Sequence, residues 1–324
     1  MMYSQREMIR VAKLYYEKGM TQQEIAVLEN ISRPTVSRIL DAAIQEGIIT
    51  FTIQYPLESV DDLEDELKKR FGLMKVCVAP VIIPEPSFIL TDVGKLLSDY
   101  LNELVSDGDT IGISWGNSLT YAAKQLLSVK RKNVRVVQLN GGVSTTAFST
   151  GATNILDQFA KAFEAQPHAL SVPTILDSRE IASALLSDSS IRDIMAVGRE
   201  ANIAVFGIGR TSYESVLNLA GYFKQDEYDK LLQKGAVGDI CSRFYSIDGT
   251  ISDEQLNDRT IGLQLEDLRR KKHTIAIACG EEKVPAVLGA VRGKYFNTLF
   301  TDETTARELI KQHDLVQTAE VQQK

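Results

Sequence analysis

The hydrophobic residues follow two different spacings along the chain. In residues 4–46 they recur every third or fourth position, as at Met8 and Val11 and at Val36 and Ile39, which predicts amphipathic helices. From about residue 75, short β-rich runs alternate with helical patterns. The runs are KVCVAP (75–80), DTIGIS (109–114), NVRVVQL (133–139), HALSV (168–172), NIAVFGI (202–208), HTIAIAC (273–279) and NTLFT (297–301). The helical spacing of residues 4–46 predicts an all-α head. The alternating runs predict that a doubly wound, mostly parallel α/β domain follows it.

Cap and turn residues divide the first part into the helices of a helix-turn-helix. Thr21 begins the capping-box pattern TQQE, and Asn30 is a residue type that tolerates the left-handed conformation of a tight turn. Ser32 is suited to cap the next helix, with Pro34 in its first turn. The run IITFTIQYP (48–56) is predicted to form one strand that closes the module.

The second helix of this motif carries the predicted DNA-binding surface. Burial of Val36 and Ile39 leaves its polar residues facing outward, and between Ile31 and Leu40 it has two arginines and no acid. Arginine can bind guanine edges or phosphates. The residues predicted to contact double-stranded operator DNA are Thr21, Gln22, Ser32, Arg33, Pro34, Thr35, Ser37 and Arg38. Because residues 1–55 hold six basic and six acidic residues, one head should bind weakly, and more than one copy is expected on DNA.

Residues 57–72 repeat apolar side chains at helical spacing, at Leu57, Val60, Leu63 and Leu67. The pattern predicts an amphipathic linker helix that could form a dimer seam, although it is too short for a coiled coil by itself. The predicted organisation is therefore a helix-turn-helix head (1–56), a linker helix (57–72) and an α/β domain (73–324).

Composition narrows the class of protein. Of the 324 residues, 44% are hydrophobic and 24% charged, which is typical of a globular protein and argues against disorder. No apolar run approaches the roughly 20 residues of a membrane span, and the charged N-terminus is not a signal-peptide pattern. Cys77, Cys241 and Cys279 lack the spacing of a disulfide framework or a metal site. We expect a cytoplasmic protein without metal, cofactor or membrane partner, and the net charge of −7 argues against a wholly basic surface.

Glycines and small polar residues follow four of the predicted strands. The stretches are GISWGNS (112–118), LNGGVSTT (139–146), FGIGRT (206–211) and ACGEEK (278–283). In a doubly wound sheet, ligands bind beyond the carboxyl ends of the strands. The segment 116–118 opens a helix whose free amides suit a phosphate, and Lys283 would add a positive charge. The four stretches together predict a site for a small anionic ligand.

One of these stretches also matches a hydrolase motif. Gly112-Ile-Ser114-Trp-Gly116 has the GxSxG spacing of a nucleophile elbow. A catalytic triad would need a histidine, and the chain has only His168, His273 and His313. His273 begins a predicted strand, at the wrong end of the sheet, and His313 lies near a polar tail. We therefore assign no catalytic residue, and a hydrolase stays the weakest alternative.

Six stretches together carry a family resemblance. They are TQQEIAVLENISRPTVSRIL (21–40), GISWGNSL (112–119), VVQLNGG (136–142), GAVGDICSRFY (235–245), LNDRTIGLQLEDL (256–268) and ACGEEKVPAVLGAVRGKYFNTLFTDETTA (278–306). Over essentially its whole length the chain resembles the SorC-type sugar-binding transcriptional regulators of bacteria, and within them the deoxyribonucleoside-regulator (DeoR) branch. The resemblance implies a homodimer or homotetramer that is released from operator DNA, as a repressor, when a phosphorylated sugar such as deoxyribose 5-phosphate binds to 73–324.

The resemblance also implies an effector-binding set. It comprises Trp115, Gly116, Asn117, Ser118, Asn140, Gly141, Asn154, Gly209, Asp239 and Lys283. One position departs from the branch: where a lysine is expected, this chain has Asn140, which can hydrogen-bond but cannot form an imine with a sugar aldehyde. Another phosphosugar therefore stays open as the effector. The alternative function is a sugar-phosphate isomerase or deaminase with a DNA-binding head, for which Asp239 is the candidate base.

Overall fold

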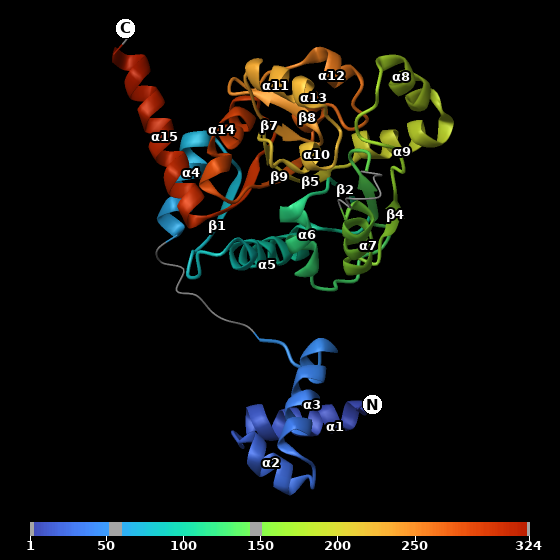
Figure 1. Ribbon diagram of the computed structural model, residues 1–324, viewed down its shortest axis with the longest axis vertical. Coiled ribbons are helices and arrows are strands. Elements are labelled where there is room, and N and C mark those ends of the chain that lie inside the picture. The colour runs from blue at the N-terminus through green and yellow to red at the C-terminus, as the bar shows by residue number, and fades with distance from the viewer. Residues whose placement is uncertain (1–2, 52–59, 143–150, 323–324) are drawn as a thin grey trace. The chain divides into compact units, whose positions relative to one another are not determined.

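A computed structural model describes residues 3–51, 60–142 and 151–322, with side chains up to residue 315 (Figure 1). The chain divides into two compact units, Met1–Pro56 and Leu57–Lys324. No helix within the described residues is long and apolar enough to cross a membrane.

The first unit is a cluster of short helices held by local caps. It contains α1 (Gln5–Ala12), a π-helical turn (Lys13–Glu17), α2 (Gln22–Leu28) and α3 (Arg33–Gln45). Thr21 forms the predicted capping box with Glu24, and Ser32 caps α3 by accepting from the backbone N–H of Thr35. Asn30 adopts the left-handed conformation with a φ of 54°, as the turn requires. The predicted strand 48–56 is wrong for residues 48–51, which form bends and irregular structure, and its other residues lie outside the described part.

The second unit is built on a seven-stranded parallel sheet. Its strands run in the order β1-β10-β9-β5-β2-β3-β4. Their bounds are β1 Lys75–Ala79, β2 Thr110–Ile113, β3 Arg135–Gln138, β4 Gln166–His168, β5 Ile203–Gly207, β9 His273–Ile277 and β10 Thr298–Asp302. Six of the seven predicted runs overlap these strands closely. The run HALSV is misplaced, because β4 ends where that run begins.

Helices cover both faces of this sheet, as expected for a doubly wound fold (Figure 1). Along β5 the side chains alternate between two buried clusters: Ile203 and Val205 join one, and Ala204 and Phe206 join the other. The helices are α4 Asp61–Phe71, α5 Pro86–Leu104, α6 Asn117–Lys124, α7 Ala152–Ala162, α8 Arg179–Ser187, α9 Ser189–Glu200, α10 Val216–Leu219, α11 Gln225–Gln233, α12 Glu254–Asp258, α13 Leu265–Leu268, α14 Val284–Arg292 and α15 Glu303–Gln322, with a 3-10 turn η3 at Glu281–Lys283.

The helix predicted for the linker forms as α4 (Asp61–Phe71), and it packs as part of the second unit. Val60, Leu63 and Leu67 are buried in the same cluster as Leu309 of α15. The carboxylate of Glu64 also accepts a hydrogen bond of 2.8 Å from the backbone N–H of Val78 on β1. These three apolar side chains of the described helix are therefore covered by the second unit itself. The backbone of α15 continues through the polar tail after residue 315 to Gln322.

A second, three-stranded antiparallel sheet lies beside the large one. It consists of β6 (Gly209–Arg210), β7 (Ala236–Ile240) and β8 (Arg243–Ser246). The hairpin between β7 and β8 turns through Cys241 and Ser242, both in the left-handed region with φ of 52° and 66°. This hairpin carries Asp239, Cys241 and Ser242, which line a pocket beside the large sheet.

Candidate functional site

The predicted DNA-contacting residues of α3 lie on its outer side. Val36, Ile39, Leu40 and Ala43 are buried, whereas Arg33 and Arg38 are exposed. Within the described residues, neither arginine has a carboxylate at ion-pairing distance. Both guanidinium groups can therefore bind an external anion or a base edge. The remaining members, Ser32, Pro34, Thr35 and Ser37, are exposed or half-buried on the same helix.

The start of α2 joins this surface. Thr21 and Gln22 line a shallow groove together with Tyr15 and Arg33. The groove thus brings together the first turns of both helices of the helix-turn-helix motif. In many such motifs the second helix enters the major groove and its neighbour contacts the backbone, an arrangement that this groove would fit.

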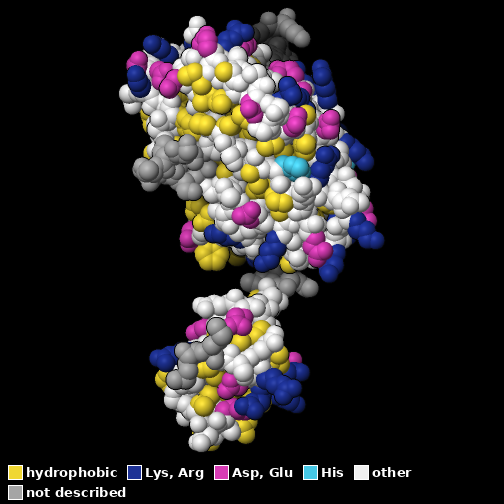
Figure 2. All heavy atoms as spheres, turned by 90° about the vertical axis from the view of Figure 1, so that its right-hand side faces the viewer, with side chains coloured by type: hydrophobic (Ala, Val, Ile, Leu, Met, Phe, Trp, Pro, Cys, Tyr) yellow, Lys and Arg dark blue, Asp and Glu magenta, His cyan; other side chains and the backbone are white. Residues whose placement is uncertain are grey.

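Charge is mixed over both units. Figure 2 shows Lys and Arg side chains on the head with Asp and Glu side chains beside them, and both signs interspersed over the visible face of the α/β unit. Arg10, for example, pairs with Glu29, and Lys13 pairs with Glu17. The face of the head that is visible in Figure 2 is therefore not purely basic, in agreement with the balanced composition of residues 1–55.

The ligand pocket lies at the switch point of the large sheet. From β2 the chain continues to β3 and β4 on one side, while β5, β9 and β10 follow on the other, so the strand order reverses between β2 and β5. A pocket of about 290 Å³ opens beyond the carboxyl ends of these two strands. Its lining comes from residues 114–119 after β2, Asn140 after β3, residues 207–210 at the end of β5, residues 214–217 at the start of α10, the β7–β8 hairpin and η3. The sequence predicted this edge of the sheet.

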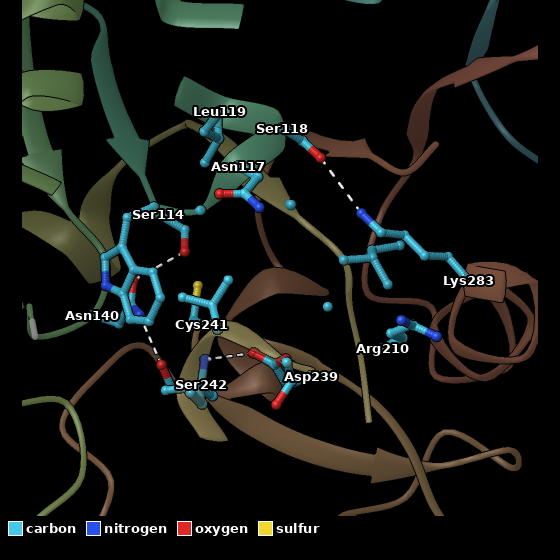
Figure 3. A pocket seen from close by; sticks show the side chains of 18 of the residues that line it. Ser114, Asn117, Ser118, Leu119, Asn140, Arg210, Asp239, Cys241, Ser242 and Lys283 are labelled. Carbon is cyan, nitrogen blue, oxygen red and sulfur yellow. Dashed lines mark hydrogen bonds between the residues drawn. The ribbon is translucent and has the colours of Figure 1, made fainter. Parts of the chain in front are cut away.

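One side of the pocket is suited to an anion. Gly116 has a φ of 131°, which favours glycine, and it immediately precedes α6. The Nζ atom of Lys283 lies 3.5 Å from the Oγ atom of Ser118 in the first turn of that helix (Figure 3). A lysine beside the amino end of a helix offers both a full positive charge and free backbone donors.

The opposite side carries a network of neutral polar groups. The Oγ atom of Ser114 donates to Asn140 Oδ1 at 3.0 Å, and Asn140 Nδ2 donates to Ser242 Oγ at 3.0 Å. Thr174 Oγ1 donates to the same Ser242 hydroxyl at 2.9 Å. Asn140 is 1% exposed, so its amide is fixed in the pocket wall by these partners.

Asp239 lies between the two sides in the view of Figure 3. Burial raises the pKa of this carboxyl to about 6, although the backbone N–H of Ser242 and the charge of Lys283 oppose the shift. The Ser242 N–H donates to Asp239 Oδ2 at 3.2 Å. At neutral pH the group is therefore mostly ionised and can accept hydrogen bonds from ligand hydroxyls.

The structure adds pocket residues that the sequence did not suggest. Arg210 lines the pocket on the side of Lys283 and pairs with Glu214, while Glu282, Cys241 and Ser242 complete the wall. The pocket thus holds three carboxylates and two cationic side chains. The two glycines of FGIGRT precede Arg210, and they were the only sequence signal for its position.

Two predicted effector residues lie outside the pocket. Asn154 is exposed on α7, where its side chain accepts from Gln158. Gly141 is covered by the chain: a Cβ atom there would lie 2.5 Å from the carbonyl oxygen of Val172, and its own carbonyl accepts from Trp115 Nε1. Trp115, Gly116, Asn117, Ser118, Asn140, Gly209, Asp239 and Lys283 all line the pocket.

The hydrolase alternative finds no support in this geometry. Ser114 donates to an amide oxygen, and none of the three histidines lines the pocket. His273 begins β9, at the edge of the sheet opposite the pocket. Among the described residues there is also no group of three His, Cys, Asp or Glu side chains that could hold a metal ion.

Comparison with known proteins agrees with both units. Residues 55–311 match the family model described as "Putative sugar-binding domain", and residues 3–50 match a homeodomain-like domain. The chain is 39% identical over 302 residues to the deoxyribonucleoside regulator of Bacillus subtilis, covering 93% of this chain and 96% of that protein. It is 33% identical over 311 residues to the sorbitol operon regulator of Klebsiella pneumoniae, covering 94% and 98%. The crystal structure of the latter, full-length SorC, matches with a TM-score of 0.75 at 30% identity, covering 96% of this chain and 100% of that one.

A helix-turn-helix head and a sugar-binding α/β unit in one chain define a DNA-binding transcriptional regulator. The chain belongs to the SorC family of sugar-binding transcriptional regulators. The family resemblance and the fold class predicted from the sequence are thereby confirmed. Both relatives are named as regulators.

Proposed function

We propose that this regulator represses a sugar or deoxyribonucleoside catabolic operon and leaves its operator when a phosphorylated sugar binds. The observation that carries the proposal is the approach of Lys283 Nζ to Ser118 at the amino end of α6, inside the pocket. These groups suit the phosphate of a small ligand. At about 290 Å³ the pocket is near the lower end of the roughly 300–1,000 Å³ typical of small-molecule sites, which favours a monosaccharide phosphate.

The polar wall and Asp239 suit the sugar. A carboxylate accepts hydrogen bonds from sugar hydroxyls, and the network of Ser114, Asn140 and Ser242 presents donors and acceptors at a fixed position. Because Asn140 stands where a lysine was expected, binding is noncovalent and reversible. Deoxyribose 5-phosphate is our first choice of effector, supported by the 39% identity to a protein named deoxyribonucleoside regulator.

The balanced charge of the head supports binding to DNA as a homodimer or homotetramer. Six basic and six acidic residues in 1–55 give one head little nonspecific affinity. Two heads on linked half-sites gain affinity because the second binding event is intramolecular. Analytical ultracentrifugation of the full chain tests this, since a monomer at operator-binding concentrations would contradict it.

The effector is tested through Trp115, the only tryptophan of the chain, which lines the pocket. The full-length protein is titrated with a panel of sugar phosphates and the matching free sugars, and tryptophan fluorescence and thermal stability are recorded. We expect deoxyribose 5-phosphate to change the fluorescence and to raise the melting temperature, with little effect of free deoxyribose. Absence of any response to phosphorylated sugars would overturn the proposal. Conversion of the sugar phosphate, followed by NMR, would instead favour the enzyme alternative.

A further inference from the structure

Asp302, at the end of β10, is a buried carboxylate that the proposed ligand contacts do not use. It is fully buried, and each of its two carboxylate oxygens accepts two hydrogen bonds. Oδ1 accepts from Thr304 Oγ1 at 2.5 Å and from the backbone N–H of Thr305 at 3.0 Å. Oδ2 accepts from Thr305 Oγ1 at 2.5 Å and from the backbone N–H of Gly280 at 3.0 Å. Four neutral donors therefore compensate for the burial of this charge.

The two oxygens have different roles. Oδ1 caps the first turn of α15, since Thr305 is the third residue of that helix. Oδ2 reaches across to Gly280, whose N–H also donates to Thr305 Oγ1 at 2.8 Å. We call Asp302, Thr305 and Gly280, with these bonds, the Asp302 clasp.

The clasp fixes the turn that presents Lys283. Gly280 has a φ of 104°, and its carbonyl accepts from the backbone N–H of Lys283 at 3.0 Å, which closes the η3 turn. Only two residues separate Gly280 from Lys283, so the place of Gly280 determines where the lysine backbone lies. Lys283 in turn reaches Ser118 in the pocket.

On its other side the clasp adjoins α15 and, through it, α4. α15 packs along α4: Leu309 shares a buried cluster with Leu63 and Leu67, and the rings of Phe71 and His313 lie 5.3 Å apart. α4 is the first described helix after the head, beginning at Asp61. A continuous set of packed and hydrogen-bonded groups thus joins the pocket lysine to the start of the α/β unit.

We propose that the Asp302 clasp positions Lys283 for the phosphate of the effector and couples occupancy of the pocket to α15 and α4. The inference rests on the proposed function and deepens it by naming how the site regulates. A ligand shifts an equilibrium only through groups that differ between the two states. A hydrogen bond to a buried charge is stronger than a surface contact, so movement of the Lys283 turn is transmitted to α15 rather than lost in solvent.

Three variants of the full chain distinguish the roles of the two Asp302 oxygens. Asp302→Asn keeps an acceptor for the cap, but its amide nitrogen cannot accept from Gly280. Thr305→Val removes the hydroxyl that bridges to Gly280, with little change of shape. Thr304→Val is the matched control, because among the described residues the Thr304 hydroxyl bonds only the capping oxygen.

Each variant is titrated with deoxyribose 5-phosphate by Trp115 fluorescence, and operator affinity is measured without and with saturating sugar. We expect Asp302→Asn and Thr305→Val to weaken sugar binding about tenfold, the effect of losing one charge-assisted hydrogen bond. Saturating sugar should reduce the operator affinity of the wild type. In the two variants we expect this sugar-induced reduction to be at least about threefold smaller. Operator affinity without sugar, which a general folding defect would lower, should stay unchanged, and Thr304→Val should behave as the wild type in every measurement.

Three results would overturn the clasp while leaving the proposed function intact. The first is that both test variants bind the sugar and release operator DNA as the wild type does. The second is that they bind the sugar more weakly but still release operator DNA fully at saturating sugar. The third is that Thr304→Val shows the same defect as the test variants. If the wild-type protein itself responds to no sugar phosphate and to no inorganic phosphate, the proposed function fails and the clasp fails with it.

Discussion

The head and the pocket hold their polar side chains in opposite ways. On the head, Arg33 and Arg38 are exposed, and the hydroxyls of Ser32 and Thr35 bond each other within one helical turn. In the pocket, Asn140 is 1% exposed and its partners are 26 and 102 residues away in the chain. The head thus presents independent groups to solvent, whereas the pocket is assembled from distant segments whose groups fix one another.

This difference has energetic consequences. Exposed charges are screened by salt and contribute little to folding, so changes on the head should alter DNA affinity and leave stability within about 0.5 kcal/mol. Buried polar groups carry desolvation costs, so changes in the pocket should alter both ligand affinity and stability.

The largest effect is expected for Asp239→Asn. Burial raises the pKa of Asp239 to about 6 from 3.8, so the carboxyl favours the folded state below pH 3.8, and this contribution is lost as the pH rises through 6. At pH 7.5 the neutral asparagine should therefore raise the free energy of unfolding by about 2–3 kcal/mol and weaken sugar binding. Denaturant unfolding of the variant and the parent at pH 7.5 and pH 4.5 checks the sign. The difference between their free energies of unfolding should be smaller at pH 4.5. An equal difference at both pH values would contradict the raised pKa of Asp239 as its cause. Asp177→Asn, at an exposed site, is the control.

Lys283→Ala comes next. Loss of this cation should weaken binding of the sugar phosphate about 30-fold, the equivalent of about 2 kcal/mol, because a charge-assisted contact in the pocket disappears. Operator affinity without sugar should stay unchanged. Titration calorimetry against the sugar phosphate and the free sugar measures the effect, with the exposed Lys230→Ala as control. An equal loss of affinity for the sugar phosphate and for the free sugar would show that Lys283 does not contact the phosphate.

Arg38→Ala tests the head. We expect operator affinity to fall about tenfold, with the salt dependence of binding reduced by about one ion if the arginine contacts a phosphate. Sugar binding, followed by Trp115 fluorescence, should match the parent. Parent-like operator affinity over a range of salt concentrations would remove Arg38 from the DNA-binding surface.

The smallest effects are expected at the pocket rim, where Arg210 pairs with Glu214. These side chains are 35% and 80% exposed, so the pair contributes at most about 1 kcal/mol, or fivefold in affinity. Glu214→Gln should tighten sugar-phosphate binding because it frees Arg210 and removes a negative charge. Arg210→Gln should weaken it. Fluorescence titrations that move in the same direction for both variants would contradict a role of this pair in phosphate binding.

Local signals in the sequence predicted the head well. The caps at Thr21 and Ser32 and the left-handed Asn30 depend on neighbours within three or four residues, and the structure confirms all three. The glycines after β2 and β5 likewise predicted the edge of the sheet where the pocket lies. The roles of the DNA-contacting residues stay a prediction.

Nonlocal contacts were not predictable in the same way. The β7–β8 hairpin turns through Cys241-Ser242, which lacks the Asn-Gly pattern typical of such turns, so the segment gave no hairpin signal. Gly141 was assigned to the ligand, but the structure shows that it makes room for the backbone of Val172 and Pro173. The apolar pattern of α4 was compatible with a linker helix, and only packing against β1 and α15 reveals its place in the core.

The most direct test measures the affinity of the full-length protein for operator DNA with and without deoxyribose 5-phosphate at constant salt. The operator is selected by the protein from a random-sequence pool, and binding is followed by fluorescence anisotropy of labelled DNA. We expect saturating sugar phosphate to weaken DNA binding by about 5- to 150-fold, the usual range of coupling between two sites. Unchanged affinity, while Trp115 reports that the sugar is bound, would contradict it.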